Sequence, residues 1–218
     1  MNKSEKKQLF NFLFIPFMFL LVMWLTKLIE LQFDLSFINL GVFPQTSKGL
    51  KGIFFSPFIH KDLTHLFNNS YPILVLGGFL FSVYRKIALQ IFIWLFFISG
   101  FWLWIIGRPS FHIGASGIIY ALAAFLFISG IIQNNRSLAA IGCVILFLYG
   151  SMIWGILPTK ESISWEGHLA GFLSGILVAI FYRKEGPKRK KYQWEIDEEI
   201  EEKIANSERG NINDTEIV

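Results

Sequence analysis

Three short segments of this 218-residue chain place polar, chemically capable side chains at the starts of apolar stretches. The first segment carries His65 and Asn69, the second carries Ser116, and the third carries His168. A hydroxyl acts as a nucleophile when a neutral imidazole accepts its proton, and N–H donors can stabilise the negative charge that develops. If folding brings the segments together, they predict a serine nucleophile with a histidine base.

Six apolar runs must position these side chains, and they are Leu9–Thr26, Leu63–Val83, Ile87–Ile106, Ile113–Ile132, Leu138–Leu157 and Gly167–Tyr182. Most are near the roughly 20 residues that cross a hydrocarbon core of about 30 Å. The mean hydropathy of +0.49, with 53% hydrophobic residues, is typical of a polytopic membrane protein. We therefore expect an all-α bundle of six transmembrane helices. Its second, fourth and sixth helices run the same way, so the polar segments should lie at one depth.

The distribution of Lys and Arg predicts the orientation of the bundle. With a cytoplasmic N-terminus, the inner side carries most of the basic residues: Lys3, Lys6, Lys7, Arg85, Lys86, Arg136, Arg183, Lys184, Lys188, Arg189, Lys190, Lys191, Lys203 and Arg209. The positive-inside rule then places both termini in the cytoplasm and the polar segments at the outer face. The first run follows three lysines, as in a signal sequence, and we expect a retained anchor.

This topology divides the chain into three regions. Residues 1–8 should form a cytoplasmic N-terminus, residues 9–182 the membrane-embedded domain, and residues 183–218 a cytoplasmic tail that is first basic and then acidic. We expect a short helix around Glu195–Ala205 and contact of the basic run with anionic lipid. The outer connection Leu28–Asp62 is rich in apolar residues, so it should lie at the membrane interface or pack on the bundle. The net charge of +4 gives no indication of nucleic acid as a partner.

The six runs contain no Asp, Glu, Lys or Arg. Ion-coupled transporters usually carry such residues inside the bundle, so the composition weighs against a pump or exchanger. A channel or small-molecule transporter is a further alternative, and the uncharged runs argue against it as well. The titratable groups at membrane depth are His65, His168 and Tyr120. The single Cys143 cannot form an intrachain disulfide, and we expect it to pack within the fifth run.

Ser116 lies between Gly114 and Gly117, which leave the backbone open beside its hydroxyl. In the first turn of a helix the N–H groups have no helical acceptor, and the helix dipole favours negative charge there. An oxyanion beside Ser116 would therefore find donors. The alternative is a tightly packed helix start, which is common at transmembrane contacts. The Gly-x-Ser-x-Gly pattern of α/β-hydrolases does not fit, because the second glycine follows the serine directly.

His168, Gly171 and Gly175 share one helical face at spacings of i, i+3 and i+7. Glycines on that face permit the close approach that a Ser–His hydrogen bond across two helices needs, although they also fit a simple packing seam. His65 and Asn69 share a face at i and i+4, and donors of this kind can contribute roughly 3–4 kcal/mol in a transition state. The alternative is a polar pair that holds neighbouring helices together.

No carboxylate is placed to orient His168, because Glu166 is two residues away and would face elsewhere. A Ser–His dyad is therefore more plausible than a triad. Tyr120 lies one turn after Ser116 and could pack on the imidazole. His112 precedes the fourth run, where we expect it in the wet interface as an alternative base.

In this order and spacing, the segments resemble the rhomboid family of intramembrane serine proteases. The resemblance extends over roughly residues 9–182 and rests on three motifs. The first is His-x4-His-x3-Asn at His60, His65 and Asn69, and the second is Gly-x-Ser-Gly at Gly114–Gly117 with Tyr120. The third is His-x2-Gly-x3-Gly at His168, Gly171 and Gly175. It implies a six-helix rhomboid-like bundle. One departure is Lys51-Gly52, where many members of the family carry Trp-Arg in the first outer loop.

The resemblance implies a role for each matching residue: Ser116 as nucleophile, His168 as base, an oxyanion hole of His65, Asn69 and the Ser116 N–H, Tyr120 stacked on His168, and His60 tying the first outer loop to the bundle. It implies cleavage of transmembrane segments of other membrane proteins near the outer membrane boundary, with no metal or cofactor. The partners would be those substrates and the lipid bilayer, and the short loops suggest a bacterial inner membrane. The alternative is a catalytically silent adaptor or chaperone that binds transmembrane helices.

Overall fold

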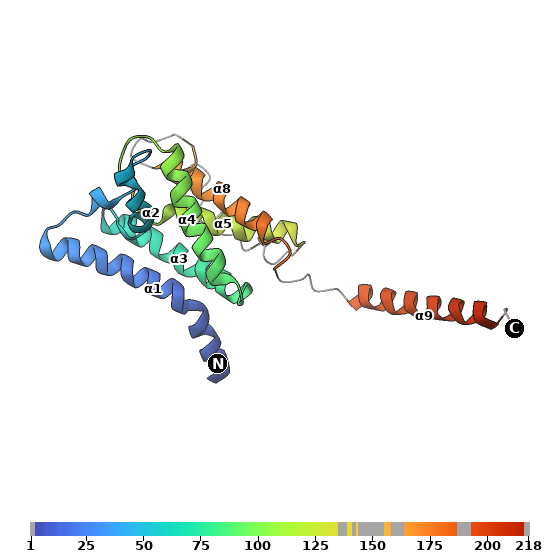
Figure 1. Ribbon diagram of the computed structural model, residues 1–218. Coiled ribbons are helices and arrows are strands. Elements are labelled where there is room, and N and C mark those ends of the chain that lie inside the picture. The colour runs from blue at the N-terminus through green and yellow to red at the C-terminus, as the bar shows by residue number, and fades with distance from the viewer. Residues whose placement is uncertain are drawn as a thin grey trace. The chain divides into compact units, whose positions relative to one another are not determined.

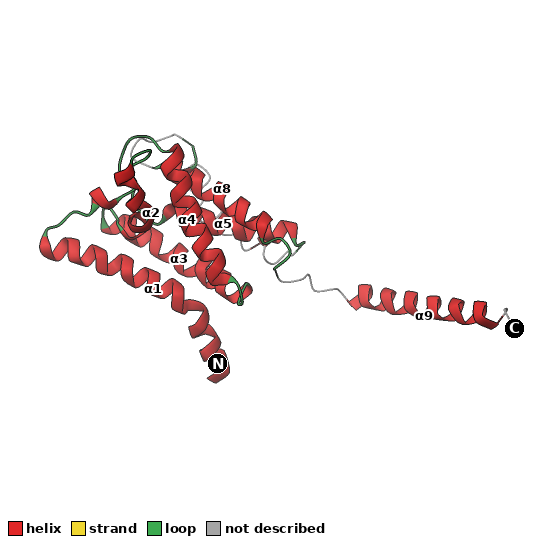
Figure 2. Ribbon diagram, in the orientation of Figure 1, coloured by secondary structure: helices red, strands yellow, loops and turns green. Residues whose placement is uncertain are grey.

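The computed structural model describes residues 3–134, 139–140, 143, 155–157, 164–186 and 193–215. Among these residues every regular element is a helix, so the protein is all-α (Figure 2). The chain divides into two compact units, Met1–Pro187 and Lys188–Val218. The fifth apolar run, Leu138–Leu157, lies largely outside the described residues.

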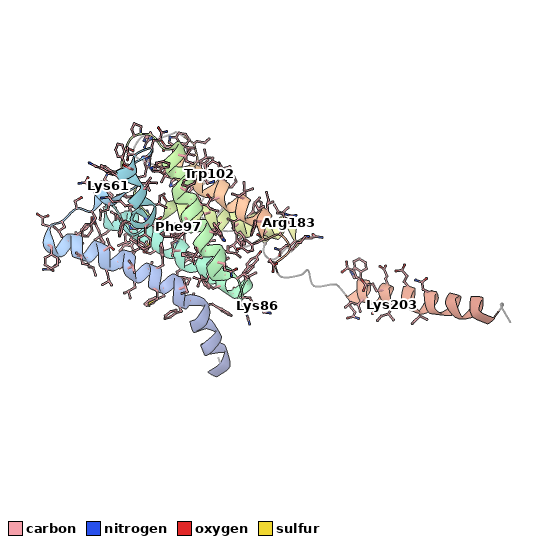
Figure 3. The ribbon with its side chains drawn as sticks, viewed as in Figure 1. Lys61, Lys86, Phe97, Trp102, Arg183 and Lys203 are labelled. Carbon is pink, nitrogen blue, oxygen red and sulfur yellow. The ribbon has the colours of Figure 1, made fainter. Side chains whose placement is uncertain are left out.

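Among its described residues, the first unit contains five long apolar helices. They are α1 (Lys3–Phe33), α3 (Leu63–Val83), α4 (Ala88–Ile106), α5 (Ser116–Ile132) and α8 (Trp165–Phe181). Three of them, α1, α3 and α4, are long and apolar enough to cross a membrane, and α5 and α8 are shorter apolar helices of 17 residues. Large apolar side chains of α1 and α4 are exposed, among them Phe17, Leu21, Leu25, Ile93 and Trp94. Phe97 and Trp102 likewise project from α4 (Figure 3). This surface is suited to contact with lipid.

Helix α5 lies at the centre of the described bundle (Figure 1). It packs most extensively against α8 and also contacts α3 and α4. Every side chain from Ile118 to Leu126 is buried, as expected for an apolar helix enclosed on all sides. Helix α1 packs on α3, where Phe19 and Met23 contribute to the core. The helix that carries Ser116 is therefore the most enclosed part of the bundle.

The connection between α1 and α3 packs on the bundle, as its apolar composition indicated. It contains short helices η1 (Ile38–Leu40), η2 (Ser47–Lys51), α2 (Gly52–Phe55) and η3 (Ser56–Phe58). The indole Nε1 of Trp104 donates to the Thr46 carbonyl at 2.9 Å, and the Gln45 N–H donates to the Trp104 carbonyl at 3.0 Å. Val42 and His112 exchange two backbone hydrogen bonds, of 3.0 and 2.9 Å. The loop is thereby fixed to the end of α4 and to the segment before α5.

The departure at Lys51-Gly52 has a local explanation. A Cβ at Gly52 would collide with the backbone of Gly41 and Val42. The loop therefore packs on its own backbone at Gly52, and hydrogen bonds of Gln45, Thr46 and Val42 hold it to the bundle.

Several helix boundaries differ from the sequence prediction, and α1 begins at Lys3 rather than at Leu9. Helix α1 continues past Thr26 to Phe33, because Lys27 and Glu30 neutralise each other in a buried ion pair of 3.1 Å. Helix α5 begins at Ser116 rather than at Ile113, because Gly114 has φ +104°, which does not fit a right-handed helix.

The second unit contains α9 (Gln193–Thr215), which extends beyond the expected Glu195–Ala205 at both ends. Its side chains are acidic over most of its first half, and Trp194, Ile196, Ile200 and Ile204 are exposed.

Candidate active site

Ser116 and His168 form a hydrogen-bonded pair between α5 and α8. Ser116 is the first residue of α5, and His168 lies in the first turn of α8. Ser116 Oγ and His168 Nε2 are 2.9 Å apart. Two residues that are 52 positions apart in the chain therefore have the distance that a nucleophile and its base require.

Glycines allow the two helices to approach this closely. A Cβ at Gly171 would collide with the carbonyl oxygen of Gly117, and one at Gly175 would collide with the carbonyl oxygen of Ala121. A Cβ at Gly117 would lie 3.2 Å from the carbonyl oxygen of Gly167. The seam between α5 and α8 is thus backbone against backbone, which brings short side chains within reach of each other.

The main chain of Gly155 sets the tautomer of His168. His168 Nδ1 lies 2.8 Å from the Gly155 carbonyl oxygen, which can only accept, so Nδ1 carries the proton. Nε2 is then the acceptor for the Ser116 hydroxyl. A backbone carbonyl thus takes the place that a carboxylate has in a triad. The ring of Tyr120 stacks on the imidazole, with centroids 4.3 Å apart and planes at 12°.

His65 and Asn69 approach the backbone just before Ser116. A Cβ at Gly114 would lie 2.8 Å from His65 Nε2 and 3.7 Å from Asn69 Nδ2. Both the close ring and the positive φ therefore require glycine at position 114. Asn69 Nδ2 donates to the His65 carbonyl at 3.1 Å, which uses one of the two amide hydrogens. His65 and Asn69 thus both lie beside Gly114, two residues before Ser116.

His60 connects the segment before α3 to the residue before Ser116. The imidazole is buried, and its Nε2 accepts a long hydrogen bond of 3.4 Å from the Ala115 N–H. Its ring meets that of His65 with centroids 5.0 Å apart. Burial, and to a smaller extent the neighbouring His65, lower the pKa of His60 to about 3. His60 is therefore neutral at physiological pH, as an acceptor must be.

His112 is not in the wet interface, and the sequence expectation was wrong on this point. It is only 3% exposed, and its Nδ1 lies 2.6 Å from Ser164 Oγ. Its Nε2 lies 3.0 Å from the Arg108 carbonyl oxygen. Burial lowers the pKa of His112, although the bond to Arg108 acts in the opposite direction. Both ring nitrogens are occupied away from Ser116, which argues against His112 as an alternative base.

A small cavity opens beside Ser116. Its volume is about 30 Å³, and its lining includes Gly114, Ser116, Gly117, His112, Ser164 and Phe96. A water molecule needs roughly 10–15 Å³ in this measure, so the cavity has room for about two waters or a small side chain. The Ser116 side chain therefore has open space directly beside it.

Three features of this region had not been anticipated from the sequence. The carbonyl of Gly155 has no sequence marker, because every residue has a carbonyl. Ser164 is one of several serines, and nothing in its neighbourhood points to a distant partner. Lys27 and Glu30 could have been found, because a spacing of i and i+3 is typical of helical ion pairs.

Comparison with known proteins agrees with this architecture. The family model of the Rhomboid domain matches residues 47–185. The uncharacterized protein Rv1337 of Mycobacterium tuberculosis (strain ATCC 25618 / H37Rv) is 34% identical over 186 residues, which cover 79% of this chain and 75% of the relative. The uncharacterized protein ML1171 of Mycobacterium leprae is 35% identical over 183 residues, covering 79% and 71%.

The family match covers more than half of the chain, so the protein belongs to the rhomboid family. This family generally comprises intramembrane serine proteases. Together with the apolar helices, the match identifies an integral membrane protein with relatives in mycobacteria.

Proposed function

We propose that the protein is an intramembrane serine endopeptidase that uses Ser116 and His168 as a catalytic dyad. The observation that carries the proposal is the 2.9 Å contact between Ser116 Oγ and His168 Nε2. The bond from His168 Nδ1 to Gly155 supports it, because this bond leaves Nε2 as the proton acceptor.

Each chemical step has a group to perform it. Ser116 Oγ attacks the carbonyl carbon of the scissile peptide bond while His168 Nε2 takes the hydroxyl proton. His168 then gives that proton to the leaving amine nitrogen as the C–N bond breaks, which leaves an ester on Ser116. Water, deprotonated by His168, hydrolyses the ester, releases the carboxylic acid product and restores the hydroxyl.

The oxyanion of the tetrahedral intermediates would accept hydrogen bonds from His65, Asn69 and the backbone N–H of Ser116. The positions of His65 and Asn69 against Gly114 support this assignment. Ser116 begins α5, so its N–H has no acceptor within the helix. Removal of one donor of this kind typically costs about 100- to 1000-fold in kcat.

The substrates are transmembrane segments of other membrane proteins, cut near the outer membrane boundary. We place six spans in the chain, with both termini in the cytoplasm of a bacterium and the dyad toward the outer face of its inner membrane. The charges support this orientation, since Lys86 and Arg183 lie at the end of the bundle opposite to Lys61 (Figure 3). The reaction as derived uses only side chains, backbone and water, and we assign it no metal or cofactor.

The test is cleavage of a transmembrane substrate by the purified full-length protein in detergent and in proteoliposomes. The variants are Ser116→Ala and His168→Ala, and the matched control is Ser174→Ala, whose buried hydroxyl donates to the Ala170 carbonyl of its own helix. We expect cleavage and fluorophosphonate labelling by the native protein and by the control, and neither by Ser116→Ala. Cleavage that persists in Ser116→Ala would refute the serine mechanism. The helix-binding adaptor would be favoured if the native protein is not labelled by the fluorophosphonate and Ser116→Ala keeps the cellular function.

A further inference from the structure

Three separate parts of the chain meet at His112. Its backbone pairs with Val42 of the first outer connection, through hydrogen bonds of 3.0 and 2.9 Å. Its ring reaches Arg108 at the end of α4 and Ser164 at the start of α8. The side chain is almost completely buried, so these contacts are shielded from competition by water.

The hydrogen bonds of the ring have a definite direction. The Arg108 carbonyl can only accept, so Nε2 of His112 must donate to it across 3.0 Å. The other nitrogen, Nδ1, is then the acceptor for the Ser164 hydroxyl at 2.6 Å. The neutral imidazole of His112, in the segment before α5, is thus hydrogen-bonded to Ser164, the residue that immediately precedes α8.

Both ends of this hydrogen bond are close in sequence to the proposed catalytic residues. His112 lies two residues before Gly114, on the segment that leads into Ser116. Ser164 is the N-cap residue of α8, and its carbonyl oxygen accepts from the His168 N–H at 3.2 Å. A shift of His112 relative to Ser164 therefore moves the nucleophile relative to the base.

A second contact joins the same two segments. Arg108 Nη1 lies 3.6 Å from Glu166 Oε1, and Glu166 is buried with its carboxylate at the start of α8. The guanidinium is partly exposed, so this pair is weaker than its charges suggest. The bond from His112 to Ser164, at 2.6 Å, is the shorter of the two connections and involves a buried imidazole.

We propose that His112, acting through Ser164, is a positioning residue that holds Ser116 and His168 at reacting distance. This inference rests on the proposed function. Catalysis by a hydrogen-bonded pair is sensitive to its geometry, and a displacement of about 1 Å can cost on the order of 100-fold in rate. The glycine seam sets how closely α5 and α8 approach, and the His112–Ser164 bond sets their relative position at the outer end.

A double-mutant cycle tests the proposal in the full-length protein. The variants are His112→Ala, Ser164→Ala and the double variant, with Ser174→Ala as the matched hydroxyl control on the same helix. The measurements are kcat and KM for a transmembrane substrate, the rate of fluorophosphonate labelling of Ser116, and thermal unfolding to establish folding. We expect each single change to lower kcat about 10- to 100-fold, with KM within about twofold of the native value. The double variant should be no slower than the slower single variant.

A conservative replacement separates positioning from packing. His112→Asn keeps an acceptor near the position of Nδ1, and it should recover a large part of the rate that His112→Ala loses. If His112→Ala does not fold, Ser164→Ala alone tests the positioning role, because this change removes a single oxygen atom and should leave the fold intact.

The outcomes separate the failure of this inference from the failure of the proposed function. If the native protein cleaves and is labelled, but Ser164→Ala has a kcat within twofold of the native value, the positioning role alone is overturned. Independent, multiplicative effects of the two single changes also overturn it. A native protein that neither cleaves nor is labelled overturns the proposed function, and the positioning role with it.

Discussion

Replacement of Lys27 by methionine removes a buried ammonium group that makes three hydrogen bonds near the C-terminal end of α1. Lys27 Nζ donates to Glu30 Oε2 at 3.1 Å, to the His60 carbonyl at 3.0 Å and to the Lys61 carbonyl at 3.1 Å. Methionine has a similar length and no charge. The change therefore leaves a carboxylate and two carbonyls without their donor, while the packing is largely preserved.

The structure indicates a large cost in the free energy of unfolding. The side chains of Lys27 and Glu30 are only 10% and 6% exposed, so solvent screens the pair little. Removal of one partner from a buried ion pair costs about 3–5 kcal/mol, because the other charge stays buried and unpaired. Glu30 would keep only the bond from the Phe37 N–H at 2.8 Å. Since whole domains are stable by about 5–15 kcal/mol, the loss should be easy to measure.

The assay is thermal unfolding in one detergent of the native protein, Lys27→Met, and the double variant Lys27→Met/Glu30→Gln. The double variant should unfold at a temperature between the other two, because it buries no unpaired charge. Lys48→Met is the control, since Lys48 is exposed. If Lys27→Met unfolds at the same temperature as Lys48→Met, the pair does not hold α1, and the reasoning is refuted.

Two further predictions concern the helix seam and acid stability. In Gly171→Ala the new Cβ collides with the Gly117 carbonyl oxygen, so fluorophosphonate labelling of Ser116 should fall at least about 100-fold. The control is Gly78→Ala, whose Cβ would meet a leucine side chain at 3.0 Å. This variant should be labelled like the native protein. Because burial lowers the pKa of His60 from 6.5 to about 3, the unfolded state binds more protons between these values, and stability should fall as the pH falls below 6.5. Between pH 7 and pH 5, His60 should lower the free energy of unfolding by about 2 kcal/mol. The measurement is the unfolding temperature, which should fall with pH in the native protein and fall less in His60→Asn. An unfolding temperature that rises in acid would contradict this prediction.

The apolar runs predicted most helices well, because their ends coincide with local signals. Helix α3 spans Leu63–Val83 as expected, and its start is fixed by Asp62, whose carboxylate accepts from the His65 N–H at 2.7 Å. Helix α1 was predicted too short, because a hydropathy pattern treats Lys27 as the end of an apolar run. The i, i+3 spacing shows that Glu30 can pair with Lys27. The carbonyls of His60 and Lys61, which also accept from Lys27, lie 33 and 34 positions away and are not part of a local pattern.

Within the site, the contacts of His168 with Ser116 and Tyr120 could be anticipated, and the partners of His112 could not. The spacing of His168 and the glycines predicted a close approach to the helix of Ser116, because helical periodicity places them on one face. The ring of His112 has the same chemistry as that of His168, yet it bonds to Ser164, 52 positions away. Only the tertiary arrangement decides which imidazole faces which hydroxyl.

The bond between His168 and the Gly155 carbonyl has a consequence for how this protein can change over evolutionary time. A side-chain carboxylate can be lost through one substitution, whereas a main-chain carbonyl is present whatever residue occupies the position. Variation there can displace the acceptor but cannot delete it, and a Cβ at position 155 would first meet the Tyr120 hydroxyl. A neutral carbonyl also stabilises an imidazolium less than a negative charge does. The proposed dyad would therefore combine an orienting group that is hard to lose with a weaker stabilisation of the imidazolium formed on proton transfer.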